Sequence, residues 1–251
     1  MKLIRDCWLV FQQQMVLLLR NPIWVFIGVF QPLMYLVLFA PLLGPALRAS
    51  SSAQTYRTFV PGLLVLLAIL SGMFKGFSLI AELRAGVIER ARVTPLSRFA
   101  MLLGRSLRDV VVMITQAVLI TVPATALGLR VHLADLLLAY LLLGVLALTT
   151  TSLSYGIALR LRSEDALSPV MNTIAQPLLL LSGILLPLTL APGWLQRLAR
   201  WNPFFWAVRG SRALFAGNVA DPAVWKGLII VLALAALSIG YGAREFARSV
   251  R

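Results

Sequence analysis

The sequence is poor in charge, in cysteine and in histidine. Charged residues make up 13% of the 251 positions, hydrophobic residues make up 60%, and the mean hydropathy is +0.89. A soluble domain of this length cannot bury so much apolar surface, so the composition predicts an integral membrane protein. Cys7 is the single cysteine. A lone cysteine excludes an intramolecular disulfide and a cysteine-based metal site, and we expect an unreactive thiol.

Three further absences narrow the function. No G-x-x-x-x-G-K-[ST] loop occurs, so the chain lacks the usual nucleotide site. The 9 acidic residues lie at the edges of apolar stretches or in loops, which disfavours a proton-coupled carrier with an acidic relay in the membrane. The single histidine, His132, lies in a predicted loop, apart from any Asp/Glu/His constellation. This disfavours an intramembrane enzyme, and we predict no catalytic residue and no metal site.

The apolar residues fall into six continuous stretches. Each is long enough to cross a hydrocarbon core of about 30 Å as a helix. Continuous runs without two-residue alternation favour helices over a β-barrel. The sequence therefore predicts an all-α integral membrane fold with six transmembrane helices. Their expected bounds are 23–43, 59–81, 110–129, 136–159, 170–190 and 227–243.

The net charge of +14 is spread over the segments that flank these stretches. This distribution indicates membrane orientation and contact with lipid, not nucleic-acid binding. Most basic residues lie in the two ends of the chain and in the second and fourth loops, so both termini are predicted to be cytoplasmic. A late basic group lies within residues 191–226, on the predicted outer side, and so opposes this rule. Tryptophans are interspersed among these basic residues, so the segment 191–226 is expected to lie in or dip into the outer leaflet.

Residues 1–22 are predicted to form an interfacial helix, with Leu3, Val10, Phe11 and Leu18 available for lipid. The alternative is a cytoplasmic extension of the first span, although the Asn-Pro pair at 21–22 favours a break.

Residues 82–98, here called the elbow, form the most charged stretch of the chain. Thr94 and Pro95 mark a helix boundary, because the residue before proline avoids the α region and proline suits the first helical position. The pattern predicts a short helix, a bend and a second helix. Such an elbow either offers a rigid protrusion to another protein or is a solvated connector whose arginines set topology.

The elbow has the order E-x-x-x-G-x-x-E at 82–89 and RVTPLSR at 92–98. This order resembles the cytoplasmic loop of type 2 ABC transporter permeases, and it is most similar to the daunorubicin-resistance type of drug-export permease. Similarity extends along nearly the whole chain, including residues 20–22, 31–32 and 183–212. Trp206 departs from the pattern, since a smaller or more polar residue is expected there.

The resemblance implies a single permease domain over residues 1–251. It has an N-terminal interfacial helix, six transmembrane helices and short re-entrant outer helices between the fifth and sixth. The elbow would be a coupling helix in a cleft of a separate ATP-binding subunit. The residues implied in that role are Gly86, Val87, Ile88, Glu89, Thr94, Pro95 and Ser97.

The implied function is that of the membrane subunit of an ATP-driven exporter of amphiphilic drug-like or lipid-like molecules in the bacterial cytoplasmic membrane. Lipid-linked glycans are the alternative cargo. The chain itself would not be an enzyme and would bind no cofactor, with ATP and Mg on the partner. Expected partners are two copies of the ATP-binding subunit, a second permease chain, identical or related, and membrane lipid.

Polar residues inside the predicted spans are candidates for a substrate path. Lys75 is either part of this path or a side chain that reaches back to the interface. Gln31, Asn172 and Gln176 either line the path or satisfy carbonyls freed by adjacent prolines. Two smaller patterns predict helix packing: the glycines at 72 and 76 allow close approach of two backbones, and the hydroxyl cluster at 149–154 suits packing or bonds to its own backbone.

Overall fold

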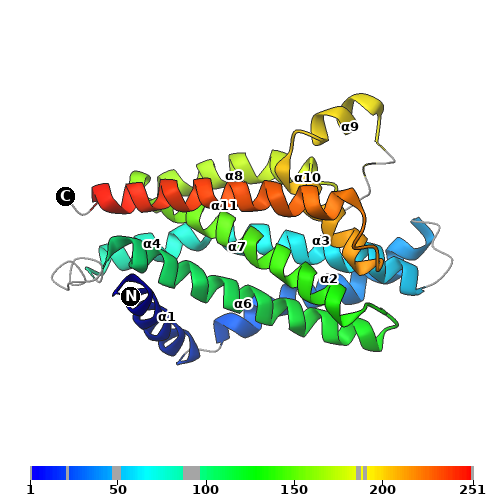
Figure 1. Cartoon of the computed structure of the whole chain (residues 1–251), viewed down its shortest axis with the longest axis horizontal. Coiled ribbons are helices and arrows are strands. Elements are labelled where there is room, and N and C mark those ends of the chain that lie inside the picture. Colours follow the sequence, from blue (N-terminus) through cyan, green and yellow to red (C-terminus); the bar gives the residue numbers. More distant parts are fainter. Residues whose placement is uncertain are drawn as a thin grey trace.

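The computed structural model describes residues 2–20, 23–46, 52–86, 97–184, 188 and 191–249. These residues form a helical bundle, and no strand occurs among them (Figure 1). The all-α prediction is therefore confirmed for the described part of the chain. The helices are α1 (Lys2–Leu19), α2 (Ile23–Ala46), α3 (Ser52–Met73), α4 (Lys75–Arg84), α6 (Arg98–Ala126), α7 (Leu133–Leu161), α8 (Glu164–Leu180), α9 (Gly193–Ala199), α10 (Pro203–Phe215) and α11 (Pro222–Ser249).

Four helical stretches are long and apolar enough to cross a membrane, namely Gln54–Arg84, Phe99–Ala126, Leu133–Leu161 and Pro222–Arg248. They correspond to the second, third, fourth and sixth predicted spans. Each helix is longer than the apolar stretch predicted from the sequence, because a helix can continue into water once its apolar part is buried. The first predicted span coincides with α2, and its membrane crossing stays a prediction.

The fifth predicted span, 170–190, differs from the helix that forms. α8 begins at Glu164 and ends at Leu180 after 17 residues. At a rise of 1.5 Å per residue it is about 26 Å long, shorter than the roughly 30 Å core. Its continuation fails because Gly183 takes a left-handed φ of +71°, which an α-helix cannot accommodate. A complete crossing at this position stays a prediction.

The two termini lie at one end of the bundle, and α9 and α10 lie at the other (Figure 1). The first end also holds the end of α4 at Arg84 and the start of α6 at Arg98, which flank the elbow. The arrangement agrees with an even number of passes along the bundle. Which end faces the cytoplasm stays a prediction.

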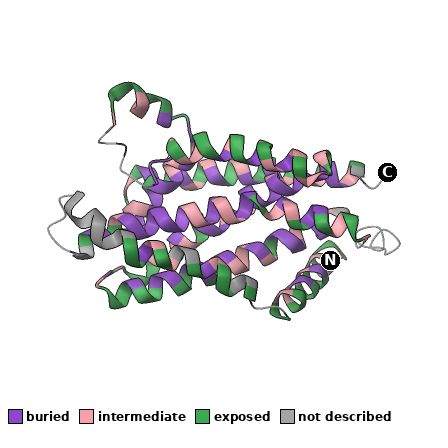
Figure 2. Cartoon of the chain, turned by 180° about the vertical axis from the view of Figure 1, so that it is seen from behind, coloured by how far each residue is buried: buried purple, intermediate pink, exposed green. Residues whose placement is uncertain are grey.

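α7 is the central helix and contacts α3, α4, α6, α8, α10 and α11. Its buried face includes Leu142, Leu143 and Leu146. Buried residues follow the inner helices, whereas the outer faces are exposed (Figure 2). Many exposed residues on α2 and α11 are large and apolar, such as Phe26 and Leu237. An apolar outer surface over a packed interior is what a bundle surrounded by lipid requires.

α1 is a separate helix, inclined to the long helices in Figure 1. Asp6, Val10 and Gln14 are buried at spacings of four residues, so they share one helical face. The prediction that Val10 contacts lipid is wrong, because a β-carbon built on Gly104 of α6 would lie 2.8 Å from Val10 Cβ. The exposed side carries apolar residues such as Ile4 and Trp8 instead, which suits an interfacial helix.

The second predicted span is interrupted at Phe74, between α3 and α4. The cause lies on α7, where the Ser154 hydroxyl inserts at the break. Ser154 Oγ donates to the Met73 carbonyl, and the Gly76 amide donates to Ser154 Oγ at 2.9 Å. A side chain that enters the i to i−4 ladder in this way is a recognised cause of a helix break.

Gly72 and Gly76 form the predicted close-packing face, and their partner is α7 of the same chain. A β-carbon on Gly72 would lie 2.0 Å from Thr150 Oγ1, and one on Gly76 would lie 2.9 Å from Ser154 O. The hydroxyl cluster therefore packs α7 against α3 and α4. Thr150 Oγ1 also bonds to carbonyls of its own helix, as predicted, and to the Ala68 carbonyl of α3 at 3.2 Å.

Candidate functional site

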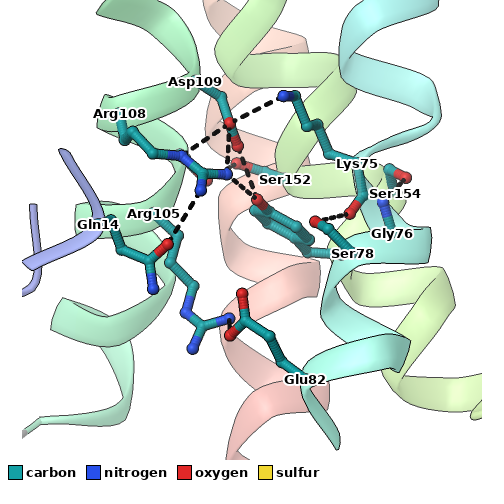
Figure 3. A network of polar contacts seen from close by, with 12 residues as sticks. Gln14, Lys75, Gly76, Ser78, Glu82, Arg105, Arg108, Asp109, Ser152 and Ser154 are labelled. Atoms are coloured by element: carbon teal, nitrogen blue, oxygen red, sulfur yellow. Dashed lines mark hydrogen bonds and ion pairs between the residues drawn. The ribbon is translucent and has the colours of Figure 1, made fainter. Parts of the chain in front are cut away.

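A buried carboxylate, Asp109 of α6, is the centre of a charged network (Figure 3). Its side chain is 2% exposed. Arg108 donates to Asp109 Oδ1 from Nη2 at 2.7 Å and from Nε at 3.1 Å. The Tyr155 hydroxyl of α7 donates to Asp109 Oδ2 at 2.6 Å. Lys75 Nζ of α4 lies 3.3 Å from Asp109 Oδ1. Three helices thus supply charged or hydroxyl groups to one carboxylate.

The network reaches α1 through Arg108. Its Nη1 donates to Gln14 Oε1 at 2.9 Å, and its Nη2 donates to the Tyr155 hydroxyl at 3.4 Å. Gln14 is 5% exposed, so this bond satisfies an amide that burial would otherwise penalise. The guanidinium of Arg108 consequently joins α1, α6 and α7.

A second ion pair lies nearer the elbow. Arg105 Nη1 of α6 is 2.5 Å from Glu82 Oε2 of α4. The contact is an ion pair by distance alone, since Glu82 Oε2 and Arg105 Nε make no hydrogen bond within the described residues. Arg105, Arg108 and Asp109 share one face of α6 because they are three and four residues apart. Lys75 and Glu82 are two turns apart on α4 and face them.

Both ends of the elbow are fastened to the bundle. The Ser97 amide, at the start of α6, donates to Asp6 Oδ2 of α1 at 3.4 Å. A carboxylate at a helix N-terminus is favourable because the exposed amides there carry partial positive charge. At the other end, Arg84 Nη1 is 3.2 Å from Glu164 Oε1 at the start of α8. The described residues at the two ends of the elbow are therefore in contact with α1 and α8.

The predicted coupling residues lie partly outside the described residues. Val87, Ile88, Glu89, Thr94 and Pro95 all fall there, so their role stays a prediction. Gly86 and Ser97 are described.

Gly86 follows the end of α4 with a φ of +67°, and no atom lies within 4 Å of a β-carbon built there. This is the left-handed conformation that commonly terminates a helix, and it explains the glycine. Ser97 has an extended backbone, at the N-cap position of α6.

The predicted substrate-path residues lie on several helices, and their shared role stays a prediction. Lys75 forms the ion pair with Asp109, and the side chain of Gln31 lies outside the described part of α2. Asn172 and Gln176 are exposed on α8. Asn172 Nδ2 donates to the Ser168 carbonyl at 2.9 Å. The prolines of α8 free the carbonyls of residues 165 and 173, so this bond does not compensate a missing proline amide.

Sequence reasoning placed Asp109 at the edge of a span and missed its partners. A signal was present in the spacing. Lys75 is nine residues before the end of α4 at Arg84, and Asp109 is eleven residues after the start of α6 at Arg98. α4 and α6 run antiparallel on either side of the elbow, so Lys75 and Asp109 lie at a similar distance from the elbow along the two helices.

The opposite end of the bundle holds the late basic group, and two of its members, Arg209 and Lys226, lie over rings of α10. Lys226 Nζ lies 5.3 Å from the Trp206 ring, and the Arg209 guanidinium lies 5.9 Å from it. These are cation–π distances. Trp206 Nε1 also donates to the Arg200 carbonyl at 3.1 Å, so this unexpected tryptophan organises the outer segment. Exposed Trp201 remains available to an interface.

Arg212 of α10 is buried and bonds to backbone. Its Nε donates to the Thr58 carbonyl at 3.1 Å, and its Nη2 donates to the Ile184 carbonyl at 2.9 Å. Burial lowers the pKa of Arg212 to about 10, so the guanidinium keeps its charge at neutral pH. The residue fastens α10 to the start of α3 and to the turn after α8. On α1, burial raises the pKa of the Cys7 thiol, in agreement with an unreactive cysteine.

Comparisons with known proteins extend over most of the chain. The family model described as "ABC-2 type transporter" matches residues 5–216. A chain of Cyanophora paradoxa named as a transport permease, ycf38, is 30% identical over 217 residues, which are 85% of this chain and 75% of the relative. The daunorubicin resistance ABC transporter permease protein DrrB1 of Streptomyces coeruleorubidus is 27% identical over 192 residues, 76% of this chain and 68% of the relative.

Proposed function

We propose that this chain, which belongs to the ABC-2 type transporter family and is thus a membrane subunit of an ABC transporter, exports amphiphilic drug-like or lipid-like molecules. The printed name of the Streptomyces relative, a daunorubicin resistance permease, supports the drug-like class. The chain contains no phosphate-binding loop of the usual kind, so a separate ATP-binding subunit supplies hydrolysis, with ATP and Mg on that partner.

The single observation that carries the mechanism is the charged network beside the elbow. Asp109 holds α4 and α6 together through Lys75, and the pair of Glu82 with Arg105 repeats that link closer to the elbow. A flexible loop would bend when the ATP-binding subunit moved and would transmit little of that movement to the helices. Each pair has one buried partner, Asp109 or Arg105, and two such links between α4 and α6 favour movement of the two helices together, so displacement of the elbow becomes displacement of α4 and α6 within the bundle.

The complex is proposed to contain two permease chains and two ATP-binding subunits. The face of Gly72 and Gly76 is occupied by α7, so a second permease must use another surface. The exposed face of α8, with Asn172, Gln176 and Leu180, is available for it. Mass measurement of the detergent-solubilised complex tests the stoichiometry. A single permease in each assembly would refute it.

The proposed location is the bacterial cytoplasmic membrane, with both termini, and with them the elbow, in the cytoplasm. This end holds both termini and flanks the elbow (Figure 1), and the segments at and near it, 1–22, 82–108 and 244–251, are rich in arginine, which the positive-inside rule favours on the cytoplasmic side. Labelling of single cysteines, introduced into a Cys7→Ala variant, by a membrane-impermeant maleimide in whole cells tests the orientation. A cysteine in place of Ser249 should be protected, and one in place of Trp201 should react.

Coupling is tested by two substitutions in the elbow. Glu89→Ala removes a charge proposed to meet the ATPase, and Ile88→Asp places a charge on the part of the elbow proposed to enter a cleft of the ATP-binding subunit. Loss of a buried charged contact at an interface costs about 2 to 5 kcal/mol, enough to release a moderately bound subunit. We expect both variants to insert normally and to lose transport, either by loss of the ATPase or by uncoupled hydrolysis.

The control is a double substitution of Arg90 and Arg92 by Gln, which removes rim charges and should have a milder effect. Full export by the Glu89→Ala and Ile88→Asp variants would mean that the elbow is only a connector.

A further inference from the structure

Two exposed cations of the late basic group, Arg209 of α10 and Lys226 of α11, lie over one indole ring. The Arg209 guanidinium is 5.9 Å from the centroid of the Trp206 ring, and Lys226 Nζ is 5.3 Å from it. Gly227, the neighbour of Lys226, lets the two helices approach, since a β-carbon built there would lie 2.7 Å from Trp206 O. Close packing of α10 on α11 thus brings two like charges to one ring.

No carboxylate of the described residues pairs with either cation. Every acidic residue except Glu89 of the elbow is described, and the ion pairs among the described residues include neither Arg209 nor Lys226. Asp221, the acidic residue nearest to Lys226 in sequence, accepts a hydrogen bond from the Ala223 amide at 2.7 Å. An aromatic ring attracts cations through its quadrupole but has no net charge, so the two positive charges are not neutralised.

Lys226 stands at the edge of the apolar surface that α11 exposes. α11 contains a stretch long and apolar enough to cross a membrane, and its large exposed side chains include Ile229, Leu232 and Leu237. Ile229 follows Lys226 by three residues, so it lies on the same side of the helix, about 4.5 Å further along the axis. Acyl chains cover such a surface, and the exposed Trp225 suits the headgroup level beside it. This places the cation pair at the depth of lipid phosphates.

We propose that Arg209 and Lys226 bind the phosphate of an anionic phospholipid whose acyl chains lie along the exposed face of α11. A zwitterionic lipid such as phosphatidylcholine balances its phosphate with its own ammonium. Two cations without a carboxylate therefore favour a headgroup of net negative charge, such as phosphatidylglycerol. Each cation near the membrane surface should strengthen binding about 5-fold, which corresponds to about 1 kcal/mol.

The site does not rest on the proposed export function. Binding there requires neither ATP nor a partner subunit, and it is expected for either orientation of the chain in the membrane.

The test follows the Trp206 ring itself. The full-length chain is labelled with 5-fluorotryptophan and placed in phosphatidylcholine nanodiscs that contain increasing fractions of phosphatidylglycerol with the same acyl chains. The ¹⁹F NMR resonance of Trp206 is assigned by its loss in Trp206→Phe. We expect this resonance to shift and to saturate as the fraction of phosphatidylglycerol rises, and the midpoint of the titration measures the affinity.

Substitutions of the cations test which groups hold the lipid. Arg209→Gln and Lys226→Gln should each move the midpoint to an about 5-fold higher fraction of phosphatidylglycerol. The double exchange Arg209→Lys with Lys226→Arg keeps both charges and should leave the midpoint within about 2-fold of the original. The matched control removes two other exposed arginines by Arg57→Gln with Arg130→Gln, and it should leave the midpoint unchanged.

A soluble anion is distinguished from a lipid by glycerophosphoglycerol, the headgroup without acyl chains. It should neither shift the Trp206 resonance nor compete with phosphatidylglycerol. If it did either, the site would bind a free phosphate ester and the assignment to lipid would be wrong.

Three further results would overturn the proposal. A Trp206 resonance that phosphatidylglycerol does not shift would mean that both cations are simply solvated. An unchanged midpoint in Arg209→Gln and Lys226→Gln would exclude these side chains as the phosphate ligands. An equal loss of affinity in the Arg57 and Arg130 control would mean that net charge, and not this pair, attracts the lipid.

Discussion

Asp109→Asn should destabilise the bundle strongly, because it leaves the cations of the charged network without their anion. The substitution keeps the volume of the side chain. It weakens contacts of 2.6 Å to Tyr155, of 2.7 and 3.1 Å to Arg108, and of 3.3 Å to Lys75. Hydrogen bonds to charged groups contribute about 1.5 to 3 kcal/mol each. Breaking a buried ion pair from one side costs about 3 to 5 kcal/mol, and we expect that loss in the free energy of unfolding.

Lys75→Met should cost much less. The lysine side chain is 29% exposed and makes one contact to the carboxylate, which keeps both Arg108 and Tyr155 after the substitution. A partly exposed pair contributes about 1 kcal/mol or less. The two variants should therefore differ by about 2 kcal/mol or more, with Asp109→Asn the less stable.

Unfolding is measured by titration of the detergent-solubilised chain with sodium dodecyl sulfate, followed by tryptophan fluorescence. The control is Glu164→Gln, whose pair with Arg84 is 40% and 58% exposed and should contribute about 1 kcal/mol or less. If Asp109→Asn lost no more stability than Lys75→Met or Glu164→Gln, the carboxylate would not be the centre of the network.

Four other substitutions test the packing of the bundle. Ser154→Ala leaves a carbonyl and an amide unpaired at the helix break and should cost about 1 to 3 kcal/mol in the same titration, whereas an unchanged midpoint would show that water replaces the hydroxyl. Gly72→Ala places a β-carbon 2.0 Å from Thr150 Oγ1 and should cost about 1 to 3 kcal/mol. Gly240→Ala meets no atom within 4 Å and should be neutral or stabilising by up to about 1 kcal/mol, so equal effects at the two glycines would contradict the packing. Arg212→Met removes two hydrogen bonds to backbone carbonyls and should accelerate hydrogen exchange in α10, whereas unchanged exchange would mean that this side chain does not anchor the helix.

Sequence composition predicted the helices because burial in lipid depends mainly on the length of an apolar run and on its lack of charge. Local chemistry predicted one further detail, since the Asn-Pro pair at 21–22 favoured a break, and α1 ends at Leu19 while α2 begins at Ile23. It did not predict that Gly86 would end α4 in a left-handed conformation. The Gly72 spacing correctly predicted close packing, but a spacing does not identify the partner helix, which is α7.

The charged network could not be read from any one helix. Asp109 stands just before an apolar window, and only the contact of α6 with α4 and α7 shows that its carboxylate is buried. The break at Phe74 has the same origin, since Ser154 is remote in sequence from the carbonyl that it satisfies. Polar contacts between residues far apart in the sequence determine both the buried network and the helix break. The periodicity within one segment cannot predict such contacts.

The most direct test of the central claim is transport in inside-out membrane vesicles that contain the chain and its ATP-binding partner. A fluorescent amphiphile of the anthracycline class is added outside, and its accumulation is followed with and without ATP. We expect uptake that requires ATP, that persists when the proton gradient is dissipated, and that Glu89→Ala abolishes while both subunits remain in the membrane. Uptake driven by the proton gradient without ATP, or full ATP-dependent uptake by the Glu89→Ala variant, would contradict the account.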